Sequence, residues 1–451
     1  MMPGMRPREA AEAVVRRLRQ AGFEAYLVGG CVRDVLLGLE PADWDVATAA
    51  RPDDAIPLFA ATREVGRHFG VLHVESGGQW IEVATFRTEG AYSDGRRPDS
   101  VAFTDARTDA ERRDFTVNAL FLDPETGAVL DFVGGQADLA ARRLRAVGDA
   151  AHRFEEDALR LLRAVRLACR LEFTIEAGTW AALQAQAGRI RSTSAERVRD
   201  ELFGMLTGPA PRRALELLET SGLLRIVLPE VQAYRGVTQS PDHHPEGDVW
   251  EHTLRMLAAM REPTVELALG VLLHDVAKPV TRVEEGGRIH FYGHETRGVE
   301  MAVAILERLR VSNATRDAVL VMIGQHMRFI ETPRMKRSTL RRFVLQTHFD
   351  AILELHRLDA VGARGDLAAW DLCRREIDAI GVERPPVRPL LSGHDLAALG
   401  MAPGPAMGRA LEALVDAQLE GQVGDPEAAR AWIQGWLRAV QLPAGQGDGG
   451  A

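Results

Sequence analysis

Residues 26–48, YLVGGCVRDVLLGLEPADWDVAT, decide the fold of the first part of the chain. An apolar run ends at Gly29 and Gly30, and an amphipathic run follows over 31–37. This order predicts a strand, a glycine turn and a helix. Neither glycine has a Cβ atom, so a phosphate can approach the N–H groups at the start of the helix. A Gly-Gly turn by itself is only a weak indication of such a loop.

Two aspartates, Asp43 and Asp45, close the same stretch. In a strand they would project from one face, about 7 Å apart along the chain. Two carboxylates on one face can hold two Mg²⁺ ions about 3.5–4 Å apart, which in-line nucleotidyl transfer needs. Asp43 and Asp45 are therefore the predicted catalytic and magnesium-binding residues. The alternative for an isolated Asp-x-Asp is a solvated turn around Trp44.

Outward from this stretch, the sequence pattern changes along the chain. Residues 1–20 predict a helix, and alternating apolar residues predict extended segments at 43–46, 70–74 and 80–86. From 136 to 235 the apolar period is near that of an α-helix, which predicts a series of amphipathic helices.

The remaining chain is expected to be helical. YRGVTQSPDHHPEGD, at 234–248, is rich in turn residues and predicts a linker, with His243 and His244 as surface residues. The predicted fold class is α+β: a small head with a mixed sheet and helices, followed by all-α domains. The expected domains are a head at 1–140, a helical neck and body at 141–238, a second helical domain at 239–362 and a helical tail at 363–451.

Composition places the chain among soluble globular proteins of several domains. It has 451 residues, of which 46% are hydrophobic and 26% charged. The sequence has no apolar run of the length a transmembrane helix needs, so we expect no membrane association. Cys31, Cys169 and Cys373 are too few and too scattered for a disulfide framework, which favours a reducing cytoplasm.

Basic residues are concentrated in two places, although the net charge is −9. Residues 141–199 contain 12 arginines against 7 acidic residues, and residues 328–342 contain six basic residues against Glu331 alone. Two basic islands on an acidic chain indicate a bounded site for a polyanion.

The order of motifs resembles that of a known family. Gly-Gly, Arg33-Asp34, Leu-Leu-Gly and Asp43-x-Asp45 are similar to the nucleotidyltransferase head of the polymerase-β superfamily. More narrowly, they resemble class II tRNA nucleotidyltransferases (CCA-adding enzymes) and bacterial poly(A) polymerases. Further similar elements are ERRDFTVNALFLD at 111–123, FRTEGAYSDGRRPDSVAF at 86–103, EEDALRLLRAVR at 155–166 and SAERVRDEL at 194–202.

This resemblance, which spans about residues 20–205, implies a set of nucleotide-binding residues. Those implied are Gly29, Gly30, Arg33, Arg112, Arg113, Asp114, Asn118, Asp157, Arg160 and Arg163. Within the set, Arg112, Arg113, Asp114 and Asn118 are expected to serve the ribose and triphosphate. The pattern also permits Glu82 as a third metal-side carboxylate, and Glu196 and Arg197 as supports for the base-reading residues.

Asp157 and Arg160 have the chemistry to select C and A. Three residues apart, they would share a helix face. An ionised Asp only accepts hydrogen bonds and an Arg only donates, which complements the amine donor and ring-nitrogen acceptor of cytosine and adenine. Guanine and uracil present the reverse order. The alternative is an ordinary surface ion pair worth a few tenths of a kcal/mol.

A second constellation lies in the C-terminal half. Imidazole nitrogens and carboxylate oxygens suit one or two divalent metals, and LLHDVAKP at 272–279 resembles the central helix of HD-domain phosphohydrolases. None of the expected positions is replaced, although a degenerate HD fold without metal is the alternative; His348 and His356 have no counterpart. The resemblance implies a divalent ion (Mg, Mn, Ni, Co or Fe) held by His252, His274, Asp275, His294, His326 and Asp359.

These features predict an enzyme that adds CCA to tRNA 3′ ends from CTP and ATP with Mg²⁺. The expected partner is tRNA, with no DNA and no membrane, and the oligomeric state is left open. The HD domain is expected to hydrolyse 2′,3′-cyclic and 2′-phosphates. The alternatives are a poly(A) polymerase or A-adding enzyme, or an HD phosphohydrolase whose head only binds RNA. The full length of the loop at 89–98 argues against a CC-adding enzyme.

Overall fold

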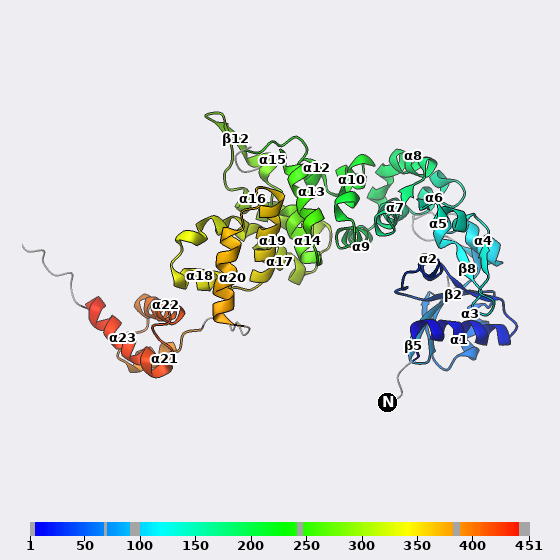
Figure 1. Ribbon diagram of the computed structural model, residues 1–451. Helices are drawn as coiled ribbons and strands as arrows, with labels where there is room; N and C mark the ends of the chain where they lie inside the picture. The colour runs from blue at the N-terminus through cyan, green and yellow to red at the C-terminus, as the bar shows by residue number, and fades with distance from the viewer. Residues whose placement is uncertain (1–4, 67–69, 91–99, 241–246, 382–387, 442–451) are drawn as a thin grey trace, which may run out of the picture. The chain divides into compact units, whose positions relative to one another are not determined.

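The computed structural model describes residues 5–66, 70–90, 100–240, 247–381 and 388–441 (Figure 1). They form two compact units. Unit 1 comprises Met1–Ala233, Glu262–Val265 and Ile305–Val311, and unit 2 comprises Tyr234–Arg261, Glu266–Ala304 and Ser312–Ala451. The finer division into four domains stays a prediction. None of the described helices is both long and apolar enough to cross a membrane.

Unit 1 begins with a mixed seven-stranded sheet of order β3-β4-β5-β2-β1-β8-β9. Its strands are β1 (Ala25–Val28), β2 (Asp45–Thr48), β3 (Thr62–Gly66), β4 (Val71–Ser76), β5 (Gln79–Thr85), β8 (Leu120–Leu122) and β9 (Val129–Asp131). Strands β2 and β5 pair in parallel, whereas the other neighbours are antiparallel. A separate hairpin pairs β6 (Arg87–Glu89) with β7 (Val101–Phe103). The mixed sheet confirms the predicted α+β head.

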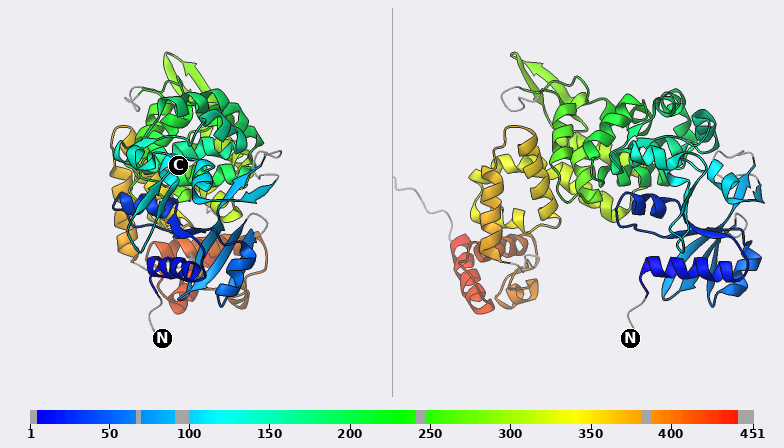
Figure 2. Two further views of the ribbon diagram at one scale, coloured as in Figure 1. Left: turned by 90° about the vertical axis from the view of Figure 1, so that its right-hand side faces the viewer. Right: turned by 45° about the vertical axis from the view of Figure 1, so that its right-hand side comes forward.

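Helices pack against this sheet, and the core of the head lies between them. They are α1 (Pro7–Gln20), α2 (Gly30–Leu36), α3 (Pro52–Ala55), α4 (Ala106–Glu111) and α5 (Gly135–Ala140), with 3₁₀ turns η1 (Ile56–Leu58) and η3 (Thr116–Asn118). Helix α1 packs across β1, β2, β4 and β5 (Figure 2). Its apolar face is fully buried there, as the amphipathic pattern of the N-terminus predicts.

The rest of unit 1 is largely helical. Its elements are α6 (Ala150–Glu156), α7 (Leu159–Arg170), α8 (Ala177–Gln186), η4 (Ala187–Ser192), α9 (Ala195–Leu206), α10 (Pro211–Thr220), α11 (Leu224–Val227) and α12 (Pro229–Gln232), with β10 (Arg143–Leu144) pairing β11 (Thr174–Ile175). Helix α7 packs on α9 and α10. The predicted helical neck is confirmed.

Unit 2 consists of helices and one hairpin. The helices are α13 (Val249–Ala259), α14 (Val265–Leu273), α15 (Lys278–Thr281), α16 (His294–Arg308), α17 (Asn313–Gln325), η5 (His326–Arg334), α18 (Arg337–Val344), α19 (Phe349–Gly362), α20 (Ala368–Ile380), α21 (Gly393–Ala398), α22 (Pro405–Leu419) and α23 (Pro426–Gln441). The last three helices share a core formed by residues such as Leu396, Leu414 and Ile433.

The hairpin of unit 2 corrects the prediction of an all-α domain. Strand β12 (Arg282–Glu285) pairs with β13 (Arg288–Phe291), and the hairpin projects from the helices (Figures 1 and 2). Gly286 and Gly287 between the strands both have positive φ, at 59° and 73°. Two-residue hairpin turns of this kind require positive φ, so the Gly-Gly pair was the signal in the sequence.

Candidate functional site

The glycine turn of unit 1 lies where the sequence predicts it. Gly29 has φ +81° and immediately precedes α2. A Cβ atom at Gly29 would lie 3.4 Å from Nη1 of Arg113, so the turn brings the backbone close to an arginine. The turn therefore lies at the N-terminus of α2, beside the guanidinium of Arg113.

Three carboxylates gather at the start of β2. Asp45 is the first residue of β2 and pairs in register with Glu82 on the parallel strand β5. Asp43 is exposed and lies two residues before the strand, so the predicted strand start at Asp43 is wrong and β2 begins at Asp45. Burial, and then the negative charge of Glu82, raise the pKa of Asp45 to about 6.

This carboxylate group fits a hard cation. Arg113 and His73 offset this rise in the pKa of Asp45 only in part, so the group keeps an excess of negative charge. All-oxygen donors of this kind suit Mg²⁺.

Arg33 is buried and holds other side chains. Its guanidinium donates to Asp34 Oδ1 at 2.8 Å and to Asn118 Oδ1 at 2.5 Å. Asp34 also forms an ion pair with Arg170 of α7, at 3.2 Å. The structure therefore places the predicted nucleotide-binding Arg33 beneath the site, where it fixes Asn118.

Arg112 and Arg113 share one buried partner that the motif analysis missed. Their guanidinium groups lie 2.6 and 2.9 Å from the two oxygens of Asp109. Asp109 is 1% exposed, and although burial raises its pKa, the two arginines lower it overall. Asp109 precedes them by three and four residues on α4, which is the helical pair spacing that could have identified it.

Asp114 lies at the centre of the predicted ribose and triphosphate group. Arg163 of α7 donates to Asp114 Oδ2 at 2.7 Å, and Asn118 donates to Oδ1 at 3.2 Å. Burial opposes ionisation, but Arg163 and Arg160 lower the pKa of Asp114 to about 2. The carboxylate is therefore a fixed hydrogen-bond acceptor at neutral pH.

Asp157 does not share a helix with Arg160, contrary to the prediction. It has extended backbone angles between α6 and α7, where its Oδ1 accepts from the N–H of Leu159. Aspartate favours such capping positions because its side chain satisfies a free backbone N–H. Arg160 instead donates to Glu156 Oε2. Both remain adjacent, since the N–H of Arg160 donates to the carbonyl of Asp157.

The expected support for Asp157 comes from α9. Arg197 donates to both carboxylate oxygens of Asp157, at 3.1 and 2.7 Å. A bidentate arginine fixes the orientation of a carboxylate as well as its charge. Glu196, the other expected support, is exposed on α9.

The first basic island is largely neutralised within unit 1. Nine of its twelve arginines form ion pairs with carboxylates, among them Arg163 with Asp114 and Arg166 with Glu201. The excess of arginine thus serves to build the site as well as to carry positive charge.

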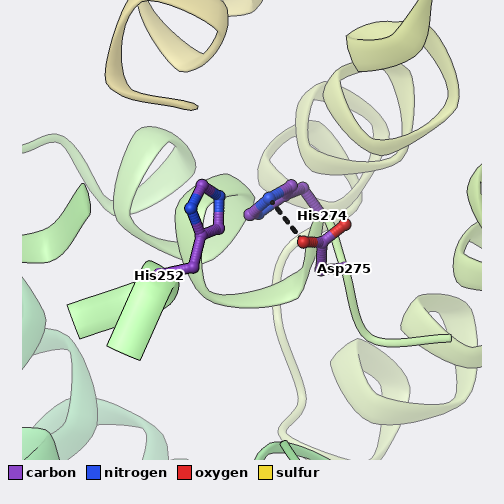
Figure 3. A group of neighbouring side chains, drawn as sticks. All are labelled: His252, His274 and Asp275. Atoms are coloured by element: carbon purple, nitrogen blue, oxygen red, sulfur yellow. Dashed lines mark ion pairs between the residues drawn. The ribbon is translucent and has the colours of Figure 1, made fainter. Parts of the chain in front are cut away.

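In unit 2 the predicted HD residues converge, and Figure 3 shows three of them, His252, His274 and Asp275. Two groups have ligand atoms all within 4.8 Å of one another: His252, His274 and Asp275, and Asp275, His294 and His326. Asp359 joins them, since its Oδ1 lies 3.0 Å from Nε2 of His252. Asp275 belongs to both groups, which is the arrangement of a bridging carboxylate.

The histidines present lone pairs to one another. The Nδ1 atoms of His274, His294 and His326 lie 2.9, 2.9 and 2.6 Å from backbone carbonyls, which fixes the proton on Nδ1. Their Nε2 atoms therefore carry the lone pair. Nε2 of His294 nevertheless lies 3.1 Å from Nε2 of His326, and Nε2 of His274 lies 3.2 Å from Asp275 Oδ2.

Acceptors that face acceptors in a buried space need a cation between them. Burial, and then the charge of His274, lower the pKa of His326 to about 3, so its proton does not serve as that cation at neutral pH. Although burial raises the pKa of Asp275, His274 and Lys278 lower it well below its usual value. The mixed nitrogen and oxygen donors fit a divalent metal.

A cavity of about 440 Å³ opens onto this cluster. His274, Asp275, His294, His326 and Asp359 lie on its wall, together with Lys278, whose Nζ is 2.7 Å from Asp275 Oδ2. His356, which has no counterpart in the HD motif, also lines the cavity and stacks on Phe329 with a centroid distance of 4.0 Å.

Two sequence expectations concern positions outside the described residues. The central part of the loop at 89–98 and the histidines His243 and His244 belong to the segments 91–99 and 241–246. The completeness of the loop therefore stays a prediction from the sequence.

Three family models match the chain in order. They are the poly(A) polymerase head domain at residues 25–145, the probable RNA and SrmB-binding site of polymerase A at 172–235, and the HD domain at 249–355. The first match contains the three carboxylates, and the third contains all HD ligands except Asp359.

Curated relatives differ in what they add. The A-adding tRNA nucleotidyltransferase of Deinococcus radiodurans is 37% identical over 91% of this chain and 95% of its own length. The CC-adding enzyme of Thermus thermophilus is 36% identical over 92% and 94%. The CCA-adding enzyme of Levilactobacillus brevis is 47% identical, but the match covers 48% of this chain and about half (54%) of that enzyme.

A solved structure matches nearly the whole chain. The CCA-adding enzyme of Bacillus stearothermophilus in complex with CTP superimposes with a TM-score of 0.75 and 29% identity, covering 97% of this chain and 99% of that one. Fold and site thus define a nucleotidyltransferase with a polymerase-type head and an HD domain. The chain belongs to the class II tRNA nucleotidyltransferase and poly(A) polymerase family.

Proposed function

We propose that this enzyme adds C, C and A to the 3′ end of tRNA, using CTP and ATP without a nucleic-acid template. The observation that carries the proposal is the carboxylate pair Asp45 and Glu82, in register on parallel strands beside exposed Asp43. The CTP complex of the Bacillus stearothermophilus relative supports nucleotide binding in a chain of this fold.

The side chains of unit 1 bind and orient the reactants. Asp43 and Asp45 would hold Mg²⁺, which would supply charge stabilisation as the tRNA 3′-hydroxyl attacks the α-phosphate and pyrophosphate leaves. Arg113, beside the glycine turn, and Arg112 attract the triphosphate. Asp114, kept ionised by Arg163, accepts from a ribose hydroxyl, while Asn118 is held in place by Arg33.

Base choice rests on Asp157. Its carboxylate, clamped by Arg197, accepts from the exocyclic amine of cytosine or adenine, and Arg160 donates to the neighbouring ring nitrogen. Uracil and guanine would place a carbonyl against the carboxylate and leave both groups unpaired. Such a site can reject the wrong base by factors of about 10⁴.

Unit 2 is proposed to be a metal-dependent phosphohydrolase. His252, His274, Asp275, His294, His326 and Asp359 would hold the metal, which supplies Lewis acidity and an activated water. Lys278 keeps Asp275 oriented through a 2.7 Å ion pair. The expected substrates are 2′,3′-cyclic and 2′-phosphates at RNA ends, so the protein would repair and extend the same terminus.

A second candidate is addition of A alone. It is supported by the match to the Deinococcus radiodurans A-adding enzyme over 91% of this chain, while the Bacillus stearothermophilus CCA-adding enzyme, which covers 97%, supports the first candidate. The residues around Asp157 accept both C and A and do not separate the two candidates.

The test uses three tRNA transcripts, ending before CCA, after CC, and complete. The protein is incubated with Mg²⁺ and labelled nucleoside triphosphates, and the product 3′ ends are sequenced. Completion of the first two with no extension of the third is the expected result. Addition of A to the CC-ended tRNA alone supports the second candidate, and long adenosine tails contradict both.

A further inference from the structure

The cavity over the metal ligands of unit 2 has an apolar rim. Among the described residues, the most exposed large apolar side chains are Ile330, Val280 and Tyr292, at 72%, 65% and 62%. Ile330 and Tyr292 line the cavity, and so does Met327. Large apolar side chains left this exposed in one place mark an interaction site.

Tyr292 is held in place by a stacked partner. The rings of His290 and Tyr292 are nearly parallel, with an interplanar angle of 5° and a centroid distance of 5.1 Å. His290 lies in β13, and Tyr292 directly follows the last residue of that strand, Phe291. The hairpin therefore presents a fixed flat ring at the cavity mouth.

The wall and the rim differ in chemistry. The wall carries five of the six metal-site residues, all but His252, together with the Lys278 ammonium. These groups suit a phosphate and its metal. The rim is apolar and aromatic, which suits a flat ring system. A volume of about 440 Å³ lies within the usual range for a small-molecule site of about 300–1,000 Å³.

A ligand with a phosphate at one end and a flat ring at the other is a nucleoside phosphate. We propose that Tyr292, with Ile330 and Met327, binds the nucleobase of the substrate and makes the HD site prefer nucleoside phosphates to phosphate esters without a base. This inference rests on the proposed hydrolase activity of unit 2. An aromatic side chain stacks on any base, so the rim selects for the presence of a base and not for its identity.

The test compares Tyr292→Ala with the unchanged full-length enzyme in the presence of Mn²⁺ or Ni²⁺. Hydrolysis of adenosine 2′,3′-cyclic phosphate is measured beside that of glycerol 1,2-cyclic phosphate, which has the same reacting group and no base. Loss of one base stack should raise KM for the adenosine substrate about tenfold and leave kinetics on the glycerol substrate unchanged. A short RNA with a 2′,3′-cyclic end, tested in parallel, shows whether the same preference acts on RNA termini.

Two matched variants complete the experiment. Tyr292→Phe keeps the ring and should retain the KM of the unchanged enzyme. Val283→Ala removes another exposed apolar side chain of the same hairpin, outside the cavity wall, and should have no effect.

Equal losses on both substrates, or no change on either, would overturn the base-binding role while leaving the hydrolase intact. Absence of hydrolysis by the unchanged enzyme with every metal would instead refute the proposed function of unit 2, and this inference with it.

Discussion

The two candidate metal sites of this chain differ in how exposed their ligands are and how close together they lie. In unit 1, Asp43 is exposed and Asp45 and Glu82 stand apart on neighbouring strands. In unit 2, buried histidine nitrogens and Asp275 lie within 4.8 Å of one another. The candidate ligands of the second site are thus gathered by the protein alone, whereas those of the first are spread over two strands and the segment before β2.

The largest expected effect is on nucleotide addition, when Asp45 of the unit 1 site is replaced. Asp45→Ala should lower nucleotide addition by at least about 10³-fold, because charge stabilisation by the metal is worth several kcal/mol and each 1.36 kcal/mol is tenfold in rate. Incorporation of labelled CTP into tRNA ending before CCA measures it. Asp200→Ala, which removes an exposed carboxylate paired with Arg199, should keep full activity. If the Asp45 variant still added nucleotides at the normal rate, the carboxylate site would not be the catalytic site.

The reciprocal change is made in unit 2. His274→Ala should weaken metal binding by at least about 100-fold and abolish phosphate-ester hydrolysis, while nucleotide addition continues. Metal content after dialysis, measured by mass spectrometry, and the two activities report the result. His394→Ala removes an exposed histidine away from the cluster and serves as the control. Unchanged metal content in the His274 variant would contradict the cluster as the binding site.

A smaller effect is expected on base choice. Asp157→Ala removes the acceptor that distinguishes cytosine from uracil, so the preference for CTP over UTP should fall by about 100-fold. Competition between labelled CTP and UTP on one tRNA measures the ratio directly. A variant that still incorporates only C and A would show that the selection lies elsewhere in unit 1.

The smallest effect concerns stability. Asp114 has a pKa lowered to about 2, so its ion pair with Arg163 stabilises the fold above pH 4 and is lost as the pH falls toward 2. Asp114→Asn should therefore cost about 2 kcal/mol at pH 7 and much less at pH 2. Urea denaturation at the two pH values measures the difference. An equal cost at both would mean that ionisation of Asp114 contributes nothing.

The sequence predicted the elements and motifs better than the contacts. The strand, glycine turn and helix around Gly29 were expected because their residues determine local backbone geometry. The HD ligands were expected from their order along the chain. Asp109 was missed because the motif used begins at Glu111, although its spacing from Arg112 and Arg113 is that of helical ion pairs.

Two errors have a common physical origin. Asp157 was assigned to a helix and Asp43 to a strand from the periodicity of their neighbours. Both residues lie outside the regular element, and the side chain of Asp157 accepts from the backbone N–H of Leu159 instead. The rim at Tyr292 was also missed, since its exposure arises from a hairpin that the helical prediction omitted.

The parallel pairing of β2 with β5 has a consequence for how the catalytic head can change over time. Asp45 and Glu82 face each other because the backbone ladder fixes their register, and strand spacing in a sheet is about 4.8 Å whatever side chains pack beneath it. Drift in the core should therefore leave the carboxylate spacing intact. Only a slip of the whole strand would destroy it, and such a slip turns every buried residue outward. A sequence change that displaced the two carboxylates would therefore also destabilise the fold of the head.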